Sequence, residues 1–122
     1  MTTMIQDKDG VIAAAPSSVP DRHFRNAWLF DSAQTAITED LAAAKVIFKD
    51  KIREVRTPLL EAEDVVYMKA LEADDATAKA ASVAKKKKLR DAPAASAITN
   101  AADIAALKAT WDSDVLGTSP YA

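Results

Sequence analysis

The chain has 122 residues, a formal net charge of −2 and no cysteine. This length supports one domain at most, and the lack of cysteine excludes disulfides and thiolate metal sites. Alanine inflates the hydrophobic fraction of 49%, and aromatic residues make up 6%. We therefore expect a small core completed by burial against a partner, and we expect neither nucleic acid nor membrane as that partner because the charge provides no basic field.

Residues 1–20 show no sustained hydrophobic period and contain Gly10, Pro16 and Pro20. Such a composition predicts an extended N-terminal arm. The charged residues 7–9 stand where a signal peptide would need an apolar run, and no stretch approaches the roughly 18 apolar residues of a membrane span. We expect synthesis in a cytoplasm without a cleaved leader.

Residues 21–38 change character. Residues 27–30 form the densest apolar patch of the chain, and the turn-prone residues 31–34 follow it. This order predicts a short β-hairpin, with Trp28 and Phe30 on one face by period-two alternation. An isolated two-stranded hairpin is marginally stable, so we expect it to pack on the following helix or on another chain.

Residues 39–93 carry the pattern of a helical hairpin or coiled-coil segment. Thr38 or Asp40 is a suitable N-cap for the first helix. A narrow apolar stripe, called here the predicted seam, then repeats in steps of three and four residues, which places it on one helix face. The seam consists of Leu41, Ala44, Phe48, Ile52, Val55, Leu59, Ala62, Val66, Ala70 and Ala73.

Pro58 interrupts this helix in sequence without shifting the phase of the seam. A proline inside a helix costs about 3 kcal/mol and disfavours helical geometry at the preceding residue. Two interpretations compete, a kinked continuous helix and two separate helices. The preserved phase from Val55 to Leu59 favours the kink.

A second helix is predicted over about residues 75–92, capped by Asp75 or Thr77. It is rich in alanine and ends with Lys85–Lys88. These lysines fit a solvated helix end that offsets the helix dipole, and a contact with an acidic partner or with nucleic acid is the alternative. Alanine would let the two helices of the hairpin approach closely.

Residues 94–112 predict short C-terminal helices. Asn100 resembles an N-cap for a helix over 101–112, on which Ile104, Leu107 and Trp111 share a face. Residues 113–122 have turn chemistry and no period, which predicts a tail. The complete pattern predicts a mainly α fold with a short β-hairpin and extended tails.

No residue pattern supports catalysis or metal binding. The single histidine, His23, lies between two arginines without a nucleophile or carboxylate that a motif would supply. The only glycines are Gly10 and Gly117, so no Gly-rich phosphate loop can form. We therefore expect no enzyme activity and no cofactor. An acidic set is best explained as a solvated helix face, since it lacks metal-ligand spacing: Glu61, Glu63, Asp64 and Glu72.

Three large rings stand out in a chain poor in aromatic residues: Trp28, Phe30 and Trp111. Such rings either nucleate a small core or anchor an interface. With six residues of the predicted seam they form the candidate interaction residues; the seam members are Leu41, Phe48, Ile52, Val55, Leu59 and Val66. Tyr121, in the predicted tail, is either a docking residue or has no role.

Several sequence blocks suggest a family. They are Asp21–Trp28, Lys51–Ala62 and Lys88–Pro93, placed after an extended arm. Over residues 18–111 this order resembles small proteins and carboxyl-terminal segments encoded among the tail genes of tailed double-stranded DNA bacteriophages. The resemblance implies a virion or virion-assembly role near the tail, fibre or baseplate, and it implies no catalytic residues.

We accordingly expect a non-enzymatic structural or adaptor component of a phage virion, made in the cytoplasm of the host bacterium. Its expected partners are other phage structural proteins or further copies of itself. A trimer is favoured, because phage fibres are generally trimeric. The alternative is a tail-fibre assembly chaperone that is not retained in the virion.

Overall fold

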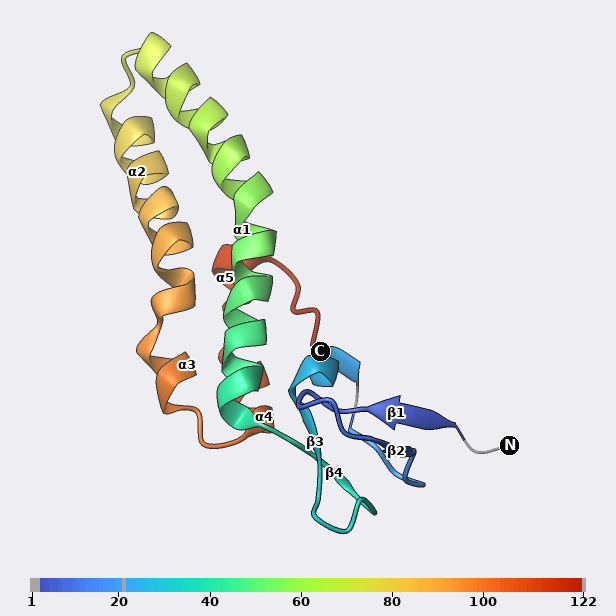
Figure 1. The fold of residues 1–122 in the computed structure, drawn as a ribbon. Coiled ribbons are helices and arrows are strands. Elements are labelled where there is room, and N and C mark those ends of the chain that lie inside the picture. The colour runs from blue at the N-terminus through green and yellow to red at the C-terminus, as the bar shows by residue number, and fades with distance from the viewer. Residues whose placement is uncertain (1–2, 21, 122) are drawn as a thin grey trace.

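The computed structural model describes residues 3–20 and 22–121, and the fold is mainly helical as the sequence predicts. A long helical hairpin rises from a base that carries two short β-hairpins and the C-terminal helices (Figure 1). The predicted arm, hairpin and tail each include residues outside the described ones: 1–2, 21 and 122.

The segment predicted as an extended arm contains a β-hairpin, which corrects that expectation. Strands β1 (Met4–Gln6) and β2 (Ile12–Ala14) pair antiparallel. The turn between them includes Gly10 at a φ of 88°, a conformation that glycine adopts without strain. Strands of only three residues leave too short a hydrophobic period to be recognised in sequence.

The buried Asp7 fixes this first hairpin to the second. Its carboxylate accepts hydrogen bonds from the backbone N–H groups of Asp9 (3.0 Å), Val11 (2.9 Å) and Phe30 (3.1 Å). Burial opposes the charged form, but these hydrogen bonds outweigh it and hold the pKa of Asp7 below its usual 3.8. The neighbouring Lys8 N–H donates to the carbonyl of Trp28 at 2.9 Å.

The second hairpin begins later than predicted. Residues Arg22–Ala27 form a 3₁₀ helix, η1, whose Phe24 leaves helical geometry and is fully buried. Strands β3 (Trp28–Phe30) and β4 (Ile37–Glu39) follow and pair antiparallel. The predicted hairpin over 21–38 is therefore shifted to 28–39, because residues 22–27 form η1 instead of strand.

Helix α1 spans Leu41–Glu72 and starts at Asp40, one of the two predicted N-caps, whose carboxylate accepts from the N–H of Ala43. The helix continues through the exposed Pro58, so the chain does not break there. Its axis changes direction about half way along (Figure 1). Just before this point the Thr57 hydroxyl donates to the carbonyl of Arg53 at 2.9 Å, an i−4 bond that often accompanies helix bending.

Helix α2 spans Ala76–Asp91 and packs antiparallel along α1. Asp75, one of the two predicted caps, accepts from the N–H of Ala78 at 3.0 Å. At the other end, the Arg56 guanidinium donates to the carbonyl of Arg90 at 2.7 Å, so α1 satisfies a terminal carbonyl of α2. The Asp75 bond is local to the start of α2, whereas the Arg56 bond joins the two helices.

The C-terminal segment returns to α1 and includes η2 (Ala92–Ala94), α3 (Ser96–Asn100), α4 (Ile104–Ala109) and α5 (Ser113–Leu116). The expected N-cap role of Asn100 is wrong, because Asn100 ends α3. Asp103 caps α4 instead, accepting from the N–H of Ala106 at 2.7 Å. The expected tail over 113–122 is also corrected, because it contains α5 and core residues.

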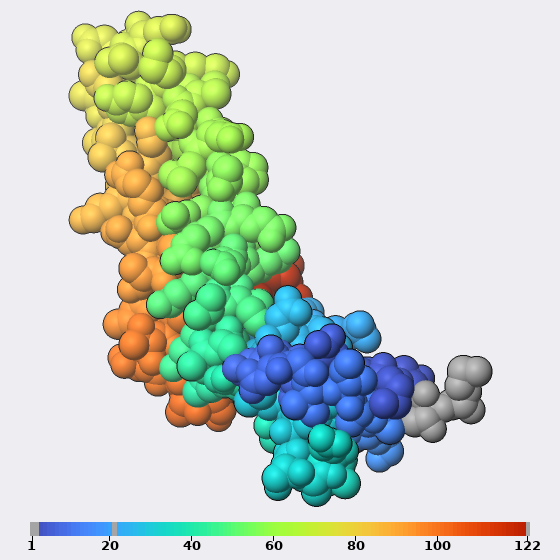
Figure 2. Space-filling view, in the orientation of Figure 1, coloured from blue at the N-terminus to red at the C-terminus, as the bar shows by residue number. Residues whose placement is uncertain are grey.

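The main core lies at the base, between the lower part of α1, η1 and the C-terminal segment. We call residues 22–56 and 89–121 the base, and residues 60–87 the distal half of the helical hairpin. In the space-filling view the distal half projects away from the β-hairpins (Figure 2). The core residues of the base are Phe24, Ala27, Ala44, Phe48, Ile52, Leu89, Ile98, Ala101, Leu107, Trp111 and Leu116.

Candidate interaction surfaces

The predicted seam is divided by the fold into a covered and an uncovered part. Phe48 and Ile52 are buried, with 0% and 2% of their surfaces exposed. Leu41, Val55 and Leu59 are half-buried and pack against the same core. Val66 is 48% exposed, whereas Ala70 beyond it is 6% exposed, so beyond Leu59 the seam is covered only in part.

An aromatic cluster from opposite ends of the chain covers the lower seam. Tyr121 stacks on Phe24 and Phe48 with ring centroids 5.2 and 5.3 Å apart. The Trp111 ring meets Tyr121 edge-on at 5.9 Å, and its indole N–H donates to the carbonyl of Gly117 at 3.0 Å. The C-terminal segment of the same chain thus occupies the seam that the sequence left for a partner.

Tyr121 is the residue of this cluster whose place the sequence did not predict. The sequence suggested either a docking role or no role for it. Burial, and secondarily the charge of Glu54, raises the pKa of the Tyr121 hydroxyl to about 12. No period surrounds Tyr121 in sequence, and its contacts with Phe24 and Phe48 are entirely long-range. A tyrosine in a chain with few aromatic residues was the only available signal.

The three aromatic candidates lie in two places. Trp111 is 8% exposed and belongs to the main core. Trp28 is 2% exposed and lies outside that core cluster, with the Arg25 guanidinium 4.6 Å from its ring centroid. Phe30 is half-buried at the end of β3. The fold therefore does not bring the three rings together, and it buries both tryptophans within the chain.

The distal half is held by a polar seam of its own between α1 and α2. Ser82 is 2% exposed, and its hydroxyl donates to the carbonyl of Glu63 at 3.4 Å. Lys85 pairs with the buried Glu63 carboxylate at 3.4 Å. Lys86 pairs with Asp64 at 2.6 Å and lies 5.2 Å from the centre of the Tyr67 ring. These contacts use two of the four lysines predicted to be a solvated helix end.

This polar seam leaves the large apolar side chains of the distal half outside. We call them the distal apolar surface, and each is between 46% and 54% exposed. Among the described residues, the other large exposed apolar side chains are Met4, Ile12, Val19 and Val46, so five of the nine lie in the distal half. Isolated exposed apolar residues are ordinary, whereas a group of them on one part of the surface makes that part a candidate interaction site. The surface consists of Val65, Val66, Met68, Leu71 and Val83.

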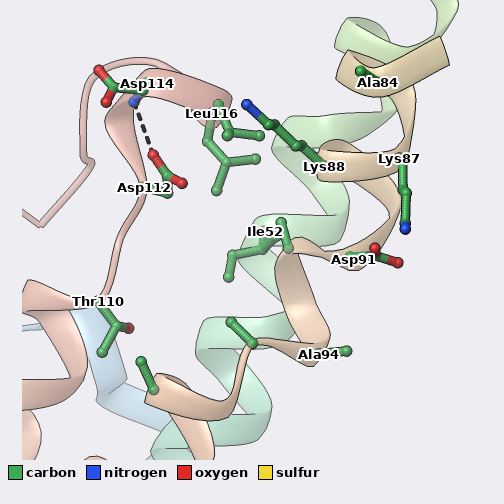
Figure 3. Close-up of a pocket in the computed structure, with 14 residues that line it drawn as sticks. Ile52, Ala84, Lys87, Lys88, Asp91, Ala94, Thr110, Asp112, Asp114 and Leu116 are labelled. Atoms are coloured by element: carbon green, nitrogen blue, oxygen red, sulfur yellow. Dashed lines mark hydrogen bonds between the residues drawn. The ribbon is translucent and has the colours of Figure 1, made fainter.

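A groove of about 980 Å³ separates the end of α2 from α5 (Figure 3). Ile52 and several alanines line its floor, and Lys88 extends from α2 toward Leu116 (Figure 3). Asp112 and Asp114 lie on the opposite wall, where the Asp112 carboxylate accepts from the N–H of Asp114 at 3.1 Å. The groove thus has an apolar floor and an acidic wall at Asp112 and Asp114. Its α2 wall carries both signs of charge, because Asp91 lies there with Lys87 and Lys88.

The residues considered for catalysis and metal binding are spread over the molecule. The His23 ring meets Tyr121 edge-on at 5.0 Å. Within residues 3–20 and 22–121, no three acidic or histidine side chains gather in a way that would hold a metal ion. In the same residues, no helix combines the length and the apolar character needed to cross a membrane.

Comparisons with known proteins add no relative. No protein-family model matches the chain, and neither the curated proteins nor the solved structures searched give a match.

Proposed function

We propose that this protein is a non-enzymatic structural or adaptor component of a bacteriophage virion, at the tail, fibre or baseplate. The observation that carries the proposal is the distal apolar surface on a projecting helical hairpin. The sequence resemblance to phage tail-region proteins supplies the particle in which this surface would act.

The structural difference between the base and the distal half supports a role in assembly. The base has a core with fully buried side chains from both ends of the chain, including Phe24, Phe48 and Leu107. The distal half has a polar helix–helix seam and exposes its apolar residues. A part that is ordered by its own base and that presents apolar side chains on a projection is suited to hold a neighbouring protein.

The partners in this proposal are other structural proteins of the particle or further copies of the chain, with a trimer favoured. Nucleic acid and membrane are not among them. The chain would be synthesised in the cytoplasm of the host bacterium and retained in the virion.

Peptide mass spectrometry of purified particles tests the proposal. We expect peptides of this chain at a fixed ratio to a major tail protein after density-gradient purification. As a control, a soluble host protein should fall with each purification step. Loss of the chain together with host proteins would contradict the structural role and would favour an assembly chaperone.

The distal apolar surface gives a second, site-directed test. Met68→Asp in the distal half should reduce incorporation into particles, because a charge would be buried at the contact. Met4→Asp is the matched control, since Met4 is similarly exposed (57%) but lies on β1. Equal incorporation of both variants would argue against the distal surface as the contact.

A further inference from the structure

Two rows of exposed side chains in the distal half have the spacing of a coiled-coil seam. On α1 the row advances in steps of four, three and four residues, and on α2 it does the same. Alternating steps of three and four keep side chains on one face of a helix that packs on another. The α1 row is Glu61, Val65, Met68 and Glu72, and the α2 row is Ala76, Ala80, Val83 and Lys87; all are exposed.

The two rows match one another when the helices run antiparallel. Val65 then lies opposite Val83, and Met68 lies opposite Ala80. At the end nearer the base, Glu61 lies opposite Lys87, a pair of opposite charge. Within the described residues neither of these two side chains forms an ion pair, so both remain available for a partner.

The chain's own α1 and α2 do not use these rows, because they already pack through Glu63 and Ser82. The ion pair Glu63–Lys85 within one chain nevertheless shows how α1 and α2 are aligned along their axes. It lies between the level at which Glu61 would meet Lys87 and the level at which Val65 would meet Val83, so the alignment within one chain is the same as the alignment between the two rows. A second copy that meets the α1 row with its α2 row would therefore lie beside the first at the same height.

We propose that the α1 row of one copy packs against the α2 row of the next, so that copies of this chain form a closed ring. The contact is heterologous, and copies at equal height have no offset along a common axis, so the contact closes into a ring when the rotation from copy to copy divides a full turn. This inference deepens the proposed function, on which it rests, by naming the surface and the partner. A symmetric contact between two α1 rows is disfavoured, because antiparallel packing would place Glu61 beside Glu72.

Engineered cysteines test the contact directly, since the natural chain has none. Full-length Val65→Cys protein mixed with full-length Val83→Cys protein should give a disulfide-linked dimer under mild oxidation. Each variant alone should remain largely uncrosslinked. Absence of the mixed dimer, or equally efficient crosslinking of Val65→Cys with itself, would overturn the proposal.

The doubly substituted chain reports the size of the ring. Val65→Cys combined with Val83→Cys should give a ladder on a denaturing gel that ends in one closed species, three chains if the favoured trimer is correct. A ladder without an upper limit would show an open filament and would overturn the closed ring.

Charge reversal gives an independent measure. Glu61→Lys and Lys87→Glu should each weaken self-association by roughly tenfold in sedimentation experiments at low salt, and the double reversal should restore it. Lys88→Glu is the matched control, because this substitution makes the same charge change at a residue next to Lys87 that is not part of the α2 row. Circular dichroism should show equal helix content in all four proteins. A weakening by Lys88→Glu as large as that by Lys87→Glu would contradict the assigned row.

Different results would overturn the ring and the proposed role in the virion. A mass of one chain, 13.0 kDa, at every concentration would overturn the ring, while peptides of the chain in particles would still support the structural role. Conversely, a ring that forms in solution but is absent from particles would remove the virion role alone.

Discussion

The base and the distal half of the helical hairpin are built on the same helix but are stabilised in different ways. In the base, Phe48 and Ile52 of α1 are covered by apolar and aromatic side chains from the C-terminal segment. In the distal half, α1 meets α2 through Ser82, Glu63 and two lysine–carboxylate pairs. Exposed or partly exposed ion pairs add little stability, so most of the folding free energy must come from the base.

The difference shows that one continuous apolar stripe need not be covered along its whole length. Where the chain's own C-terminal segment reaches, the stripe forms a core. Beyond Leu59 the segment does not reach, and side chains such as Val66 remain exposed. The length of the covering segment, rather than the pattern on α1, determines where the core ends.

The largest expected difference between the base and the distal half is the difference in stability between the Phe48→Ala and Val65→Ala variants. Phe48 is fully buried, so its truncation should lower the free energy of unfolding by about 3–5 kcal/mol. Val65 is 54% exposed, and its truncation should change that free energy by less than about 0.5 kcal/mol. Urea unfolding followed by circular dichroism measures both. Similar losses would show that the distal half is as well packed as the base.

Pro58 lies between the two regions, and Pro58→Ala sharpens the boundary. Alanine restores an N–H donor to the carbonyl of Glu54 and has a much higher helix propensity. Since Pro58 is exposed, we expect the free energy of unfolding to rise by about 1–2 kcal/mol. Glu61→Ala is the control and should be nearly neutral. A loss of stability in Pro58→Ala would mean that packing requires the bend.

Alkaline titration probes the base through Tyr121, and the other tyrosine of the chain, Tyr67, lies in the distal half. The pKa of Tyr121 is raised to about 12, so its contribution to stability is fully present below pH 10 and is lost as the pH rises toward 12. The phenolate absorbance of Tyr121 should therefore appear only as the pH approaches 12, together with loss of the base. Tyr121→Phe should remove this late step, and its persistence in that variant would assign it to Tyr67.

The smallest expected effect is confined to the first β-hairpin. Asp7→Asn should loosen the bonds to Val11 and Phe30 and increase amide hydrogen exchange there by roughly tenfold, with little change in α1. Because the pKa of Asp7 is lowered, the wild-type hairpin keeps this stabilisation above about pH 4 and loses it as the pH falls through the native pKa. Faster exchange throughout α1 would contradict a local role.

The parts of the fold that sequence predicted are those governed by local chemistry. Each of these parts depends on interactions between residues close together in the sequence. They are the N-caps Asp40 and Asp75, the phase of α1 through Pro58, and the alanine-rich helix α2. The parts that were missed depend on distant partners. The first β-hairpin is fixed by Asp7 to Phe30, and the supposed tail is fixed by Tyr121 to Phe24 and Phe48.

The candidate interaction residues show the same limit. From Leu41 to Leu59 the named residues of the stripe are buried or half-buried, but the stripe contained no information on which chain would cover it. Trp28 and Trp111 are placed in separate parts of the molecule, a separation that composition does not reveal. The exposed row with Val65 and Met68 lies on another face of α1, outside the predicted seam, and was recognised only from the exposure of each side chain.

The position of Tyr121 also has a consequence for synthesis on the ribosome. Chain elongation at about 5–20 residues per second separates the emergence of Phe48 from that of Tyr121 by several seconds. During this interval α1 and α2 can already pair through local contacts, whereas the aromatic cluster lacks its central ring. The nascent chain thus carries an open apolar face next to a formed helical hairpin, and this face is covered once Tyr121 has emerged.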